Sequence, residues 1–251
     1  MFTAKGFTES PMTAPTIEYY GLSSYSIKWN DLHLLVDPWF TGPSWDTPSP
    51  TSFDDVDYIL VTHGAYDHLG DTVPIADEYG AHVITEPAVA DHLLDQGLPA
   101  KQVTRVIWGN QFDVGDVRCR ALETRHLSYF ESGNQQLSGT PLGFYFEFET
   151  VDIYYLGDTS IFSDLKLFGE LYAPQIALVP IGAAPGARAP LPPREAAIVT
   201  EWLGVDTVVP VHYVPGSTEI DEFTESVMEI KLEERPEIAA LEPTDRFTYD
   251  G

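Results

Sequence analysis

Cysteine is nearly absent from this chain. Cys119 is the one cysteine in 251 residues, so an intrachain disulfide is excluded. Proteins without disulfides are typical of reducing compartments, and we expect a cytoplasmic location. Cys119 lies in a strand-like segment between two arginines, with no histidine beside it in the sequence. A half-buried structural thiol is therefore expected rather than a nucleophile.

Basic residues are scarce as well. The chain has 13 Lys and Arg against 39 Asp and Glu, a formal net charge of −26. The acidic residues are scattered rather than gathered in a tail, which is typical of the solvated surface of halophilic proteins. The lack of a broad basic face argues against nucleic-acid binding. It does not exclude a small anionic substrate held by metal ions.

Long apolar runs are also missing. No run approaches the roughly 18 residues of a membrane helix, so no membrane association is expected. Residues 1–15 contain one lysine and no apolar stretch of the kind that a signal peptide needs. This segment is rich in Thr, Ser, Pro and Gly without any period, and we expect a flexible N-terminus over residues 1–15.

A substantial core can nevertheless form, because 43% of the residues are apolar and 12% are aromatic. We find no internal repeat and no linker that divides the chain. Strands precede helices in both halves, which predicts one α/β (α+β) domain over residues 16–251, with two sheets face to face and helices outside. Strands are predicted at 17–20, 26–29, 32–36, 58–61, 82–85, 103–108, 112–114, 117–122, 142–148, 153–156, 176–179, 208–211 and 246–249, and helices at 72–79, 88–96, 194–203 and 221–232.

The segment from Val61 to Asp71 carries the densest chemistry. His63, Asp67 and His68 fall within six residues, directly after an apolar strand, on what reads as a strand-to-helix loop. A single histidine is more often structural, and Asp67 alone could cap a helix. Together, however, imidazole and carboxylate groups on one tight loop favour a metal chelate.

Polar residues at strand ends recur along the whole chain. Residues at strand ends can converge on one edge of a packed sheet even when they are far apart in sequence. Gly157 precedes one of these residues and allows the backbone to turn close to a bulky neighbour. The residues at or just after an apolar run are Asp37, His63, Asp67, His68, His126, Asp158 and His212.

These motifs carry a resemblance. The chain resembles the metallo-β-lactamase-fold hydrolases, in particular the branch similar to ascorbate-phosphate lactonase and to predicted Zn-dependent hydrolases. The motifs follow the family's order and cover roughly Ile17 to Pro215. The matching stretches are Ile17 to Phe40, Thr62 to Asp71, Leu142-Gly143-Phe144, Tyr155-Leu156-Gly157-Asp158-Thr159, Val179-Pro180-Ile181-Gly182 and Val209-Pro210-Val211-His212-Tyr213.

The resemblance implies a four-layer αββα sandwich with a metal site at one edge. His63 and His126 would serve a first metal, and Asp67, His68 and His212 a second. Asp158 would bridge the two metals, and Asp37 would lie behind the ligands and orient the loop that carries them. Zinc is the expected cofactor, as one or two ions, with Mn or Fe as alternatives.

The sequence departs from the family pattern at two positions. Ala65 stands where the family has another histidine ligand, and Gly21-Leu22 replaces a Gly-His pair. Because alanine cannot coordinate a metal, we expect an intact second site and a weakened or empty first site. Tyr66 and Tyr213 could compensate, although packing or pocket roles suit both better.

Three functions compete. We expect a metal-dependent hydrolase of a small ester, lactone or phosphodiester that acts through a metal-bound hydroxide, with Asp67 orienting the nucleophile. The alternative is a degenerate member that binds one metal and turns over weakly or not at all, because of Ala65. A nuclease is less favoured, since the basic surface is missing.

Two arginines and two serines are candidates for further roles near the expected ligands. Arg125 and Arg188 could hold an anionic group or serve only in surface ion pairs. Ser128 and Ser160 are expected to be loop residues, with no Ser-His-Asp arrangement. A small-molecule substrate is expected, and a homo-oligomer is left open.

Overall fold

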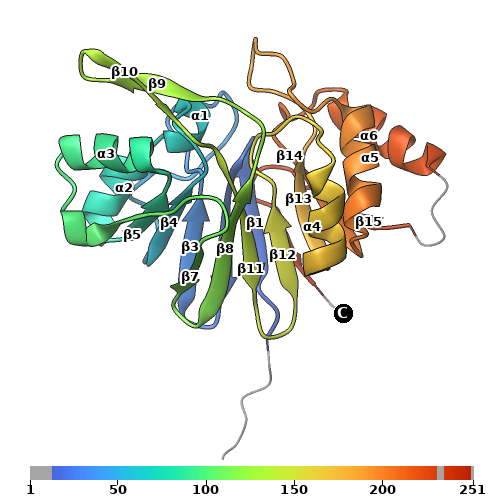
Figure 1. Cartoon of the computed structure of the whole chain (residues 1–251), viewed down its shortest axis with the longest axis horizontal. Coiled ribbons are helices and arrows are strands. Elements are labelled where there is room, and N and C mark those ends of the chain that lie inside the picture. The colour runs from blue at the N-terminus through green and yellow to red at the C-terminus, as the bar shows by residue number, and fades with distance from the viewer. Residues whose placement is uncertain (1–12, 231–234, 250–251) are drawn as a thin grey trace, which may run out of the picture.

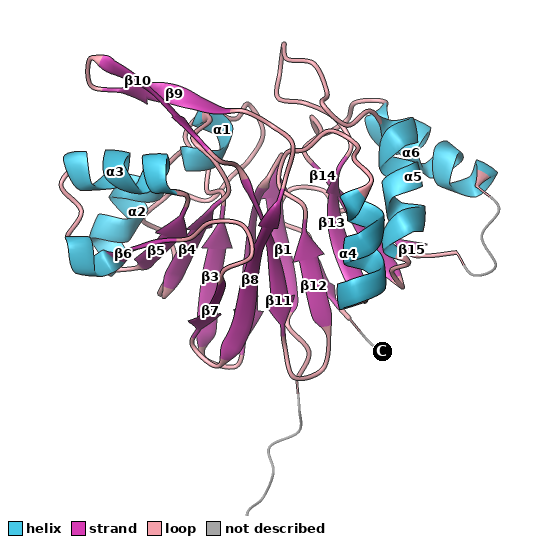
Figure 2. Ribbon diagram, in the orientation of Figure 1, coloured by secondary structure: helices cyan, strands magenta, loops and turns pink. Residues whose placement is uncertain are grey.

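Two seven-stranded β-sheets lie face to face, with helices on both outer faces (Figures 1 and 2). The computed structural model describes residues 13–230 and 235–249. Residues 1–12 of the predicted flexible N-terminus lie outside the described residues, and residues 13–15 have no regular secondary structure.

The first sheet has the strand order β16-β1-β2-β3-β4-β5-β6. Strands β3 to β6 are parallel neighbours, so their carboxyl ends meet at one edge of the sheet. The strand bounds are β1 (Thr16–Gly21), β2 (Ser24–Trp29), β3 (Leu32–Val36), β4 (Tyr58–Val61), β5 (His82–Thr85), β6 (Val103–Arg105) and β16 (Arg246–Thr248).

The second sheet has the order β15-β14-β13-β12-β11-β8-β7. Strands β12 to β15 are parallel, and β11 runs antiparallel to both β8 and β12, so β8, β12 and β14 end at the same edge. The bounds are β7 (Gln111–Val114), β8 (Val117–Glu123), β11 (Leu142–Glu147), β12 (Asp152–Tyr155), β13 (Ile176–Pro180), β14 (Thr207–Val211) and β15 (Glu237–Ile238).

The helices form the outer layers. Helices α2 (Thr72–Tyr79) and α3 (Pro87–Asp95), with the short α1 (Tyr66–Leu69) and a 3₁₀ turn (Ala100–Gln102), lie on the side of the first sheet. Helices α4 (Asp164–Tyr172), α5 (Pro193–Leu203) and α6 (Glu219–Glu229) cover the second. Among the described residues, no helix is both long and apolar enough to cross a bilayer.

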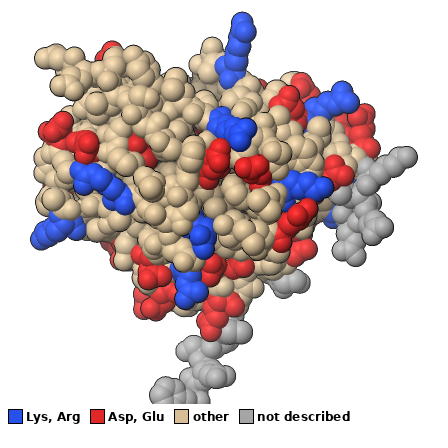
Figure 3. All heavy atoms as spheres, viewed as in Figure 1, with Lys and Arg blue, Asp and Glu red and all other residues tan. Residues whose placement is uncertain are grey.

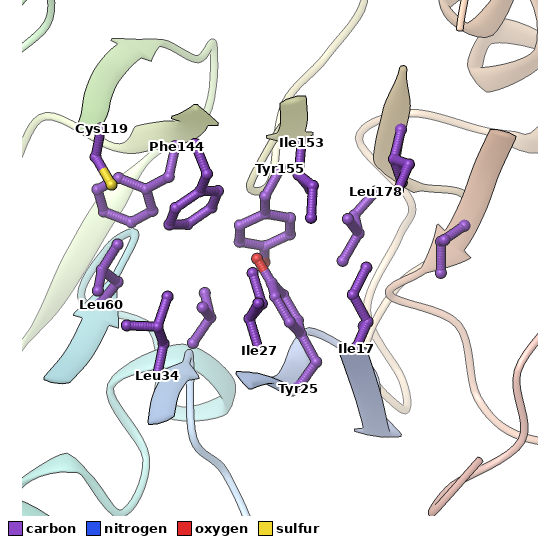
Figure 4. Packing of buried hydrophobic residues seen from close by; sticks show 14 of the residues in the cluster. Ile17, Tyr25, Ile27, Leu34, Leu60, Cys119, Phe144, Ile153, Tyr155 and Leu178 are labelled. Atoms are coloured by element: carbon purple, nitrogen blue, oxygen red, sulfur yellow. The ribbon is translucent and has the colours of Figure 1, made fainter. Parts of the chain in front are cut away.

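Three apolar clusters account for this layering. The central cluster fills the space between the sheets, where Tyr25, Leu34, Phe144 and Tyr155 interdigitate (Figure 4). The other two lie between each sheet and its helices. Strands buried on both faces need nearly continuous apolar runs, and the parallel strands have them. The predicted four-layer αββα arrangement is confirmed.

Cys119 belongs to the central cluster and is fully buried (Figure 4). The predicted burial of the thiol was therefore too small, since Cys119 is fully rather than half buried. The side chain points between the sheets rather than towards solvent, because alternate residues of β8 face the central core.

The regular elements that the sequence missed are short, polar or interrupted. The hairpin β9 (Ser128–Ser132) and β10 (Gln135–Gly139) forms a separate two-stranded sheet, and its second strand has almost no apolar alternation. Helix α1 is one turn long, so the prediction that Asp67 and His68 lie on a loop was wrong. Helix α4 contains Gly169, where a Cβ would press on the backbone of α5.

Other predicted elements shifted by a few residues. The strand predicted at 103–108 ends at Arg105, because residues 107–110 form a turn closed by Asn110. The last predicted helix ends at Glu229, and residues 231–232 lie outside the described part of the chain.

Acidic side chains are spread over the face shown in Figure 3, with basic side chains among them rather than in a separate block.

Candidate metal centre

The polar residues predicted to converge come from the same edge of the two sheets, the upper edge in Figure 1. Asp37 follows β3, His63 lies just past β4, and α1 carries Asp67 and His68. In the second sheet, His126 comes after β8, Asp158 after β12 and His212 directly after β14.

Unusual backbone angles turn two of these residues towards the centre. Asp37 has φ +45° and His212 has φ +57°, values that few non-glycine residues adopt. Backbone hydrogen bonds hold both conformations, from Asp37 N to Leu60 O and from His212 N to Leu22 O. Such strained residues cluster at functional sites. Gly157, at φ +63°, makes the close turn that was predicted before Asp158.

Asp67, His68 and His212 form a tight cluster beside Asp158. We call these four residues the second group. His212 Nε2 lies 3.4 Å from Asp67 Oδ2 and 3.1 Å from Asp158 Oδ2. His68 Nε2 lies 3.5 Å from the same Asp158 oxygen. Asp67, His68 and His212 offer ligand atoms within 4.8 Å of one another, and all are buried. The structure thus brings together the four residues expected at the second metal.

His63, His126 and Asp158, which we call the first group, are arranged more loosely. His126 Nε2 is 3.7 Å from Asp158 Oδ2, and the His63 and His126 rings lie 5.1 Å apart between centroids. His63 shares a 4.8 Å cluster with His68 and Asp158, whereas His126 belongs to neither three-residue cluster found among the described residues. The His126 side chain is 28% exposed, while His63 is fully buried.

Several buried polar atoms at this centre make no hydrogen bond to the described residues. Buried polar atoms in native proteins are almost always paired, so a group of unpaired ones needs an explanation. Imidazole nitrogens and carboxylate oxygens that point at one another suit zinc and related divalent metals. The residues present therefore fit a metal ion. The unpaired atoms are His63 Nε2, His68 Nε2, His212 Nε2 and Asp158 Oδ1.

Asp37 lies directly behind His68. Its Oδ2 accepts from His68 Nδ1, from the Thr62 hydroxyl and from the Tyr155 hydroxyl, each at 2.8 Å, and its Oδ1 accepts from Thr62 N. Because a carboxylate oxygen accepts, His68 Nδ1 must carry the proton, which leaves Nε2 to face the centre. This is the contact that the predicted orienting role of Asp37 requires.

The charges of the metal-free centre follow from this arrangement. Burial raises the pKa of Asp67, but His68 and His212 outweigh it and lower that pKa to about 2. The pKa of Asp158 is lowered in the same way, against burial, by His212 and His68. Burial lowers the pKa of His68, but Asp37 and Asp158 outweigh it and raise the pKa well above its usual value. Both carboxylates are thus ionised, as metal ligands must be.

The histidines of the first group, unlike His68, have lowered pKa values. Burial, followed by the repulsion of His68, holds the pKa of His63 well below its usual value. Burial likewise lowers the pKa of His126. Both rings are therefore neutral near pH 7, the form that binds a metal.

Other residues singled out in the sequence lie elsewhere or are already engaged. The Arg125 Nε donates to Glu123 Oε1 at 3.2 Å and its guanidinium lies over Phe162, while Arg188 is on an exposed loop. Tyr66 packs edge-on against Trp39, and the Tyr213 hydroxyl donates to Leu241 O.

Sequence reasoning missed the residues that support the ligands. Thr62 and Tyr155 hold Asp37, and Tyr155 carried no local signal of that role. Ser128 was expected on a loop, but it is fully buried at the start of β9, so that prediction was wrong.

Comparison with known proteins agrees with this description. Residues 33–213 match the family described as Beta-lactamase superfamily domain. The chain is 36% identical over 224 residues to a UPF0173 metal-dependent hydrolase of Rubrobacter xylanophilus, covering 86% of this chain and 88% of that one. It is 32% identical over 235 residues to a UPF0173 metal-dependent hydrolase of Methanopyrus kandleri, covering 92% and 98%.

A solved structure shows the same fold at lower identity. Igni18, a metallo hydrolase from Ignicoccus hospitalis, superimposes with a TM-score of 0.77 at 22% identity, over 95% of this chain and all of that one. The family match and the two relatives cover most of the chain. The chain therefore belongs to the metallo-β-lactamase superfamily and is a metal-dependent hydrolase of that superfamily.

Proposed function

We propose that the chain hydrolyses a small ester, lactone or phosphodiester at the edge where the two sheets meet. The observation that carries this proposal is the second group, in which two buried imidazole nitrogens, unpaired among the described residues, face Asp67 and Asp158. A divalent cation held there would lower the pKa of water towards neutrality and polarise a substrate oxygen.

The protein's own residues supply position and proton handling. Asp67, ionised because its pKa is about 2, accepts a hydrogen bond from the attacking water and orients it. Asp37 fixes the His68 ring, and Gly182 O, 3.3 Å from His212 Nδ1, does the same for His212. With the ring nitrogens engaged on one side, both Nε2 atoms stay aimed at the centre.

A degenerate enzyme with one metal is the second candidate. Ala65, at the start of α1, offers no ligand to the first group, and His126 stands apart from the tight clusters. In this version Asp67, His68, His212 and Asp158 hold the only ion and turnover is weak. A nuclease is less favoured, because the surface is acidic and Arg125 is already ion-paired.

Metal analysis of the purified protein beside an Ala65→His variant tests these candidates. Both proteins are assayed on esters, lactones and phosphodiesters. Two equivalents of metal with turnover by the unsubstituted protein would support the hydrolase with two ions. One equivalent without turnover, restored by Ala65→His, would support the degenerate enzyme. Salt-dependent binding of RNA or DNA would instead favour the nuclease.

The remaining expectations belong to this proposal. We expect zinc, with manganese or iron as alternatives, and elemental analysis identifies the ion. A small-molecule substrate, a cytoplasmic location and a halophilic surface stay predictions, and the oligomeric state stays open.

A further inference from the structure

The hairpin β9–β10 lies against α3 and against the loop after β4 that carries His63 and Gly64, which we call the metal loop, rather than in either large sheet. Its side chains alternate along β9. Ser128, Phe130 and Ser132 face the protein, whereas Tyr129 is 56% exposed. The contact with the metal loop is close, because a Cβ at Gly64 would overlap the Phe130 ring.

Ser128 joins the hairpin to the loop that carries His63. Its hydroxyl accepts a hydrogen bond from Gly64 N at 3.0 Å and donates one to Glu86 Oε1 at 2.9 Å. Ser128, Gly64 and Glu86 are all buried. A hydroxyl that both donates and accepts in a buried site is held in one orientation.

Glu86 anchors this connection. Its carboxylate also accepts from Ala88 N at 2.7 Å and Val89 N at 3.2 Å, so it caps the start of α3. Gly139, the cross-strand partner of Ser128, leaves room for the carboxylate, which a Cβ there would overlap. Three elements therefore meet at one fully buried side chain.

The two ends of this connection lie beside the first-group histidines. Gly64 directly follows His63, and Ser128 comes two residues after His126. Ala65 provides no side-chain ligand that could tie the loop to a first metal. The hydrogen bonds of Ser128 are therefore a direct link between the loop of His63 and the strand that follows His126.

We propose that Glu86 and Ser128 are positioning residues that hold His63 and His126 in register for a metal at the first group. This inference rests on the proposed metal centre but not on the substrate. It gives the Ser128 contact a role at the metal centre, whereas an ordinary contact would only attach the hairpin to the protein. The hairpin offers a matched comparison, because Ser132 Oγ lies 2.9 Å from His92 Nδ1 on α3, whereas the hydrogen bonds to Glu86 and Gly64 come from Ser128.

Metal titration of the metal-depleted protein tests the proposal. Co²⁺ binding is followed by visible absorption and by calorimetry in the natural sequence, Ser128→Ala, Ser132→Ala and Glu86→Gln. His126→Ala and His212→Ala identify which binding event belongs to which group. We expect Ser128→Ala to weaken the His126-dependent event about 10–100-fold and to leave the His212-dependent event within about two-fold. Ser132→Ala should leave both events unchanged.

Glu86→Gln keeps the size of the side chain and should give a smaller loss at the same event. It also serves as the test if Ser128→Ala does not fold. Combining Ser128→Ala with His126→Ala should cause no further loss, since the position that Ser128 supports is already empty.

Three results would overturn the proposal. The first is equal losses for Ser128→Ala and Ser132→Ala. The second is a Ser128→Ala effect that persists in the His126→Ala background. The third is a natural protein whose titration does not change on His126→Ala. All three are independent of turnover, so a failure of the proposed hydrolysis with an intact Ser128 effect would remove only the substrate assignment.

Discussion

The two halves of the metal centre differ in what supports them. The second group is backed by the central core, where the Thr62 and Tyr155 hydroxyls both donate to Asp37 and all three side chains are buried. The first group rests on the polar hairpin, and His126 remains partly exposed. Groups held by a close-packed core are pre-organised, whereas a hairpin with few apolar contacts opens at lower free-energy cost. We therefore expect the tighter metal to occupy the second group.

The largest expected effect is the loss of that tight site. His68→Ala and His212→Ala each remove an imidazole and leave two buried carboxylates with less compensation. Both variants should lose tight metal binding, measured as metal content by elemental analysis after dialysis. His82→Ala is the matched control, because His82 is half-buried on β5 and its side chain is hydrogen-bonded to Thr104, away from the metal centre. Unchanged metal content in both ligand variants would contradict the second group as the main site.

The support behind His68 gives the next largest effect. Asp37→Asn suits the positive φ at this position, since asparagine tolerates that region, but its amide cannot accept all the hydrogen bonds that Oδ2 receives. Metal affinity should fall about 10–100-fold, measured by competition with a chelator.

Asp71→Asn is the matched control for that variant. Asp71 is also a buried carboxylate, and it accepts from Phe40 N, Thr41 N and the Thr41 hydroxyl, none of which belongs to a proposed metal ligand. The Asp71→Asn variant should have a lower melting temperature and an unchanged metal affinity. Equal losses of affinity in both variants would mean that Asp37 acts on stability alone.

The pH dependence of the metal-free protein should separate the two groups by sign. Burial lowers the pKa of His212, but Asp158 outweighs it and the pKa is raised, so its stabilisation is present below about 6.5 and is lost as pH rises through the folded value. Burial lowers the pKa of His126, so its neutral form is favoured and stability is lost as pH falls below about 6.5.

Urea unfolding at pH 5.5 and pH 8 measures these contributions by subtraction. The free-energy difference between the natural sequence and His212→Ala should shrink at the higher pH. The free-energy difference between the unsubstituted protein and His126→Ala should grow at the higher pH. The same sign for both variants would remove the electrostatic distinction between the groups.

The smallest effect concerns the acidic surface of the whole protein. With a net charge of −26, self-repulsion should be relieved in molar salt, where the screening length is about 3 Å. The melting temperature should rise by about 2–4 °C for each kcal/mol of repulsion removed. Melts that do not move between low and molar salt would argue against a halophilic surface.

Much of the fold could be predicted because its signals are local. Apolar runs marked most of the strands of both sheets, and Asp71 and Gly80 bracketed α2 as expected. The hairpin β9–β10 could not be found this way, since β10 has almost no apolar alternation and Ser128 is bonded to Glu86, 42 positions away. The single turn of α1 was too short to carry a periodic signal.

By itself, the sequence determined the layer architecture, because the strand pattern is local. It also determined that His63, Asp67 and His68 lie close together, because all three are on one short segment. Only the tertiary structure decided that Tyr155 holds Asp37 across 118 positions and that Ser128 joins Glu86 to Gly64. It also decided that Asp158 lies closer to His212 than to His126. These contacts join residues far apart in the chain, and they exist only after the two sheets have packed and brought their strand ends to one edge.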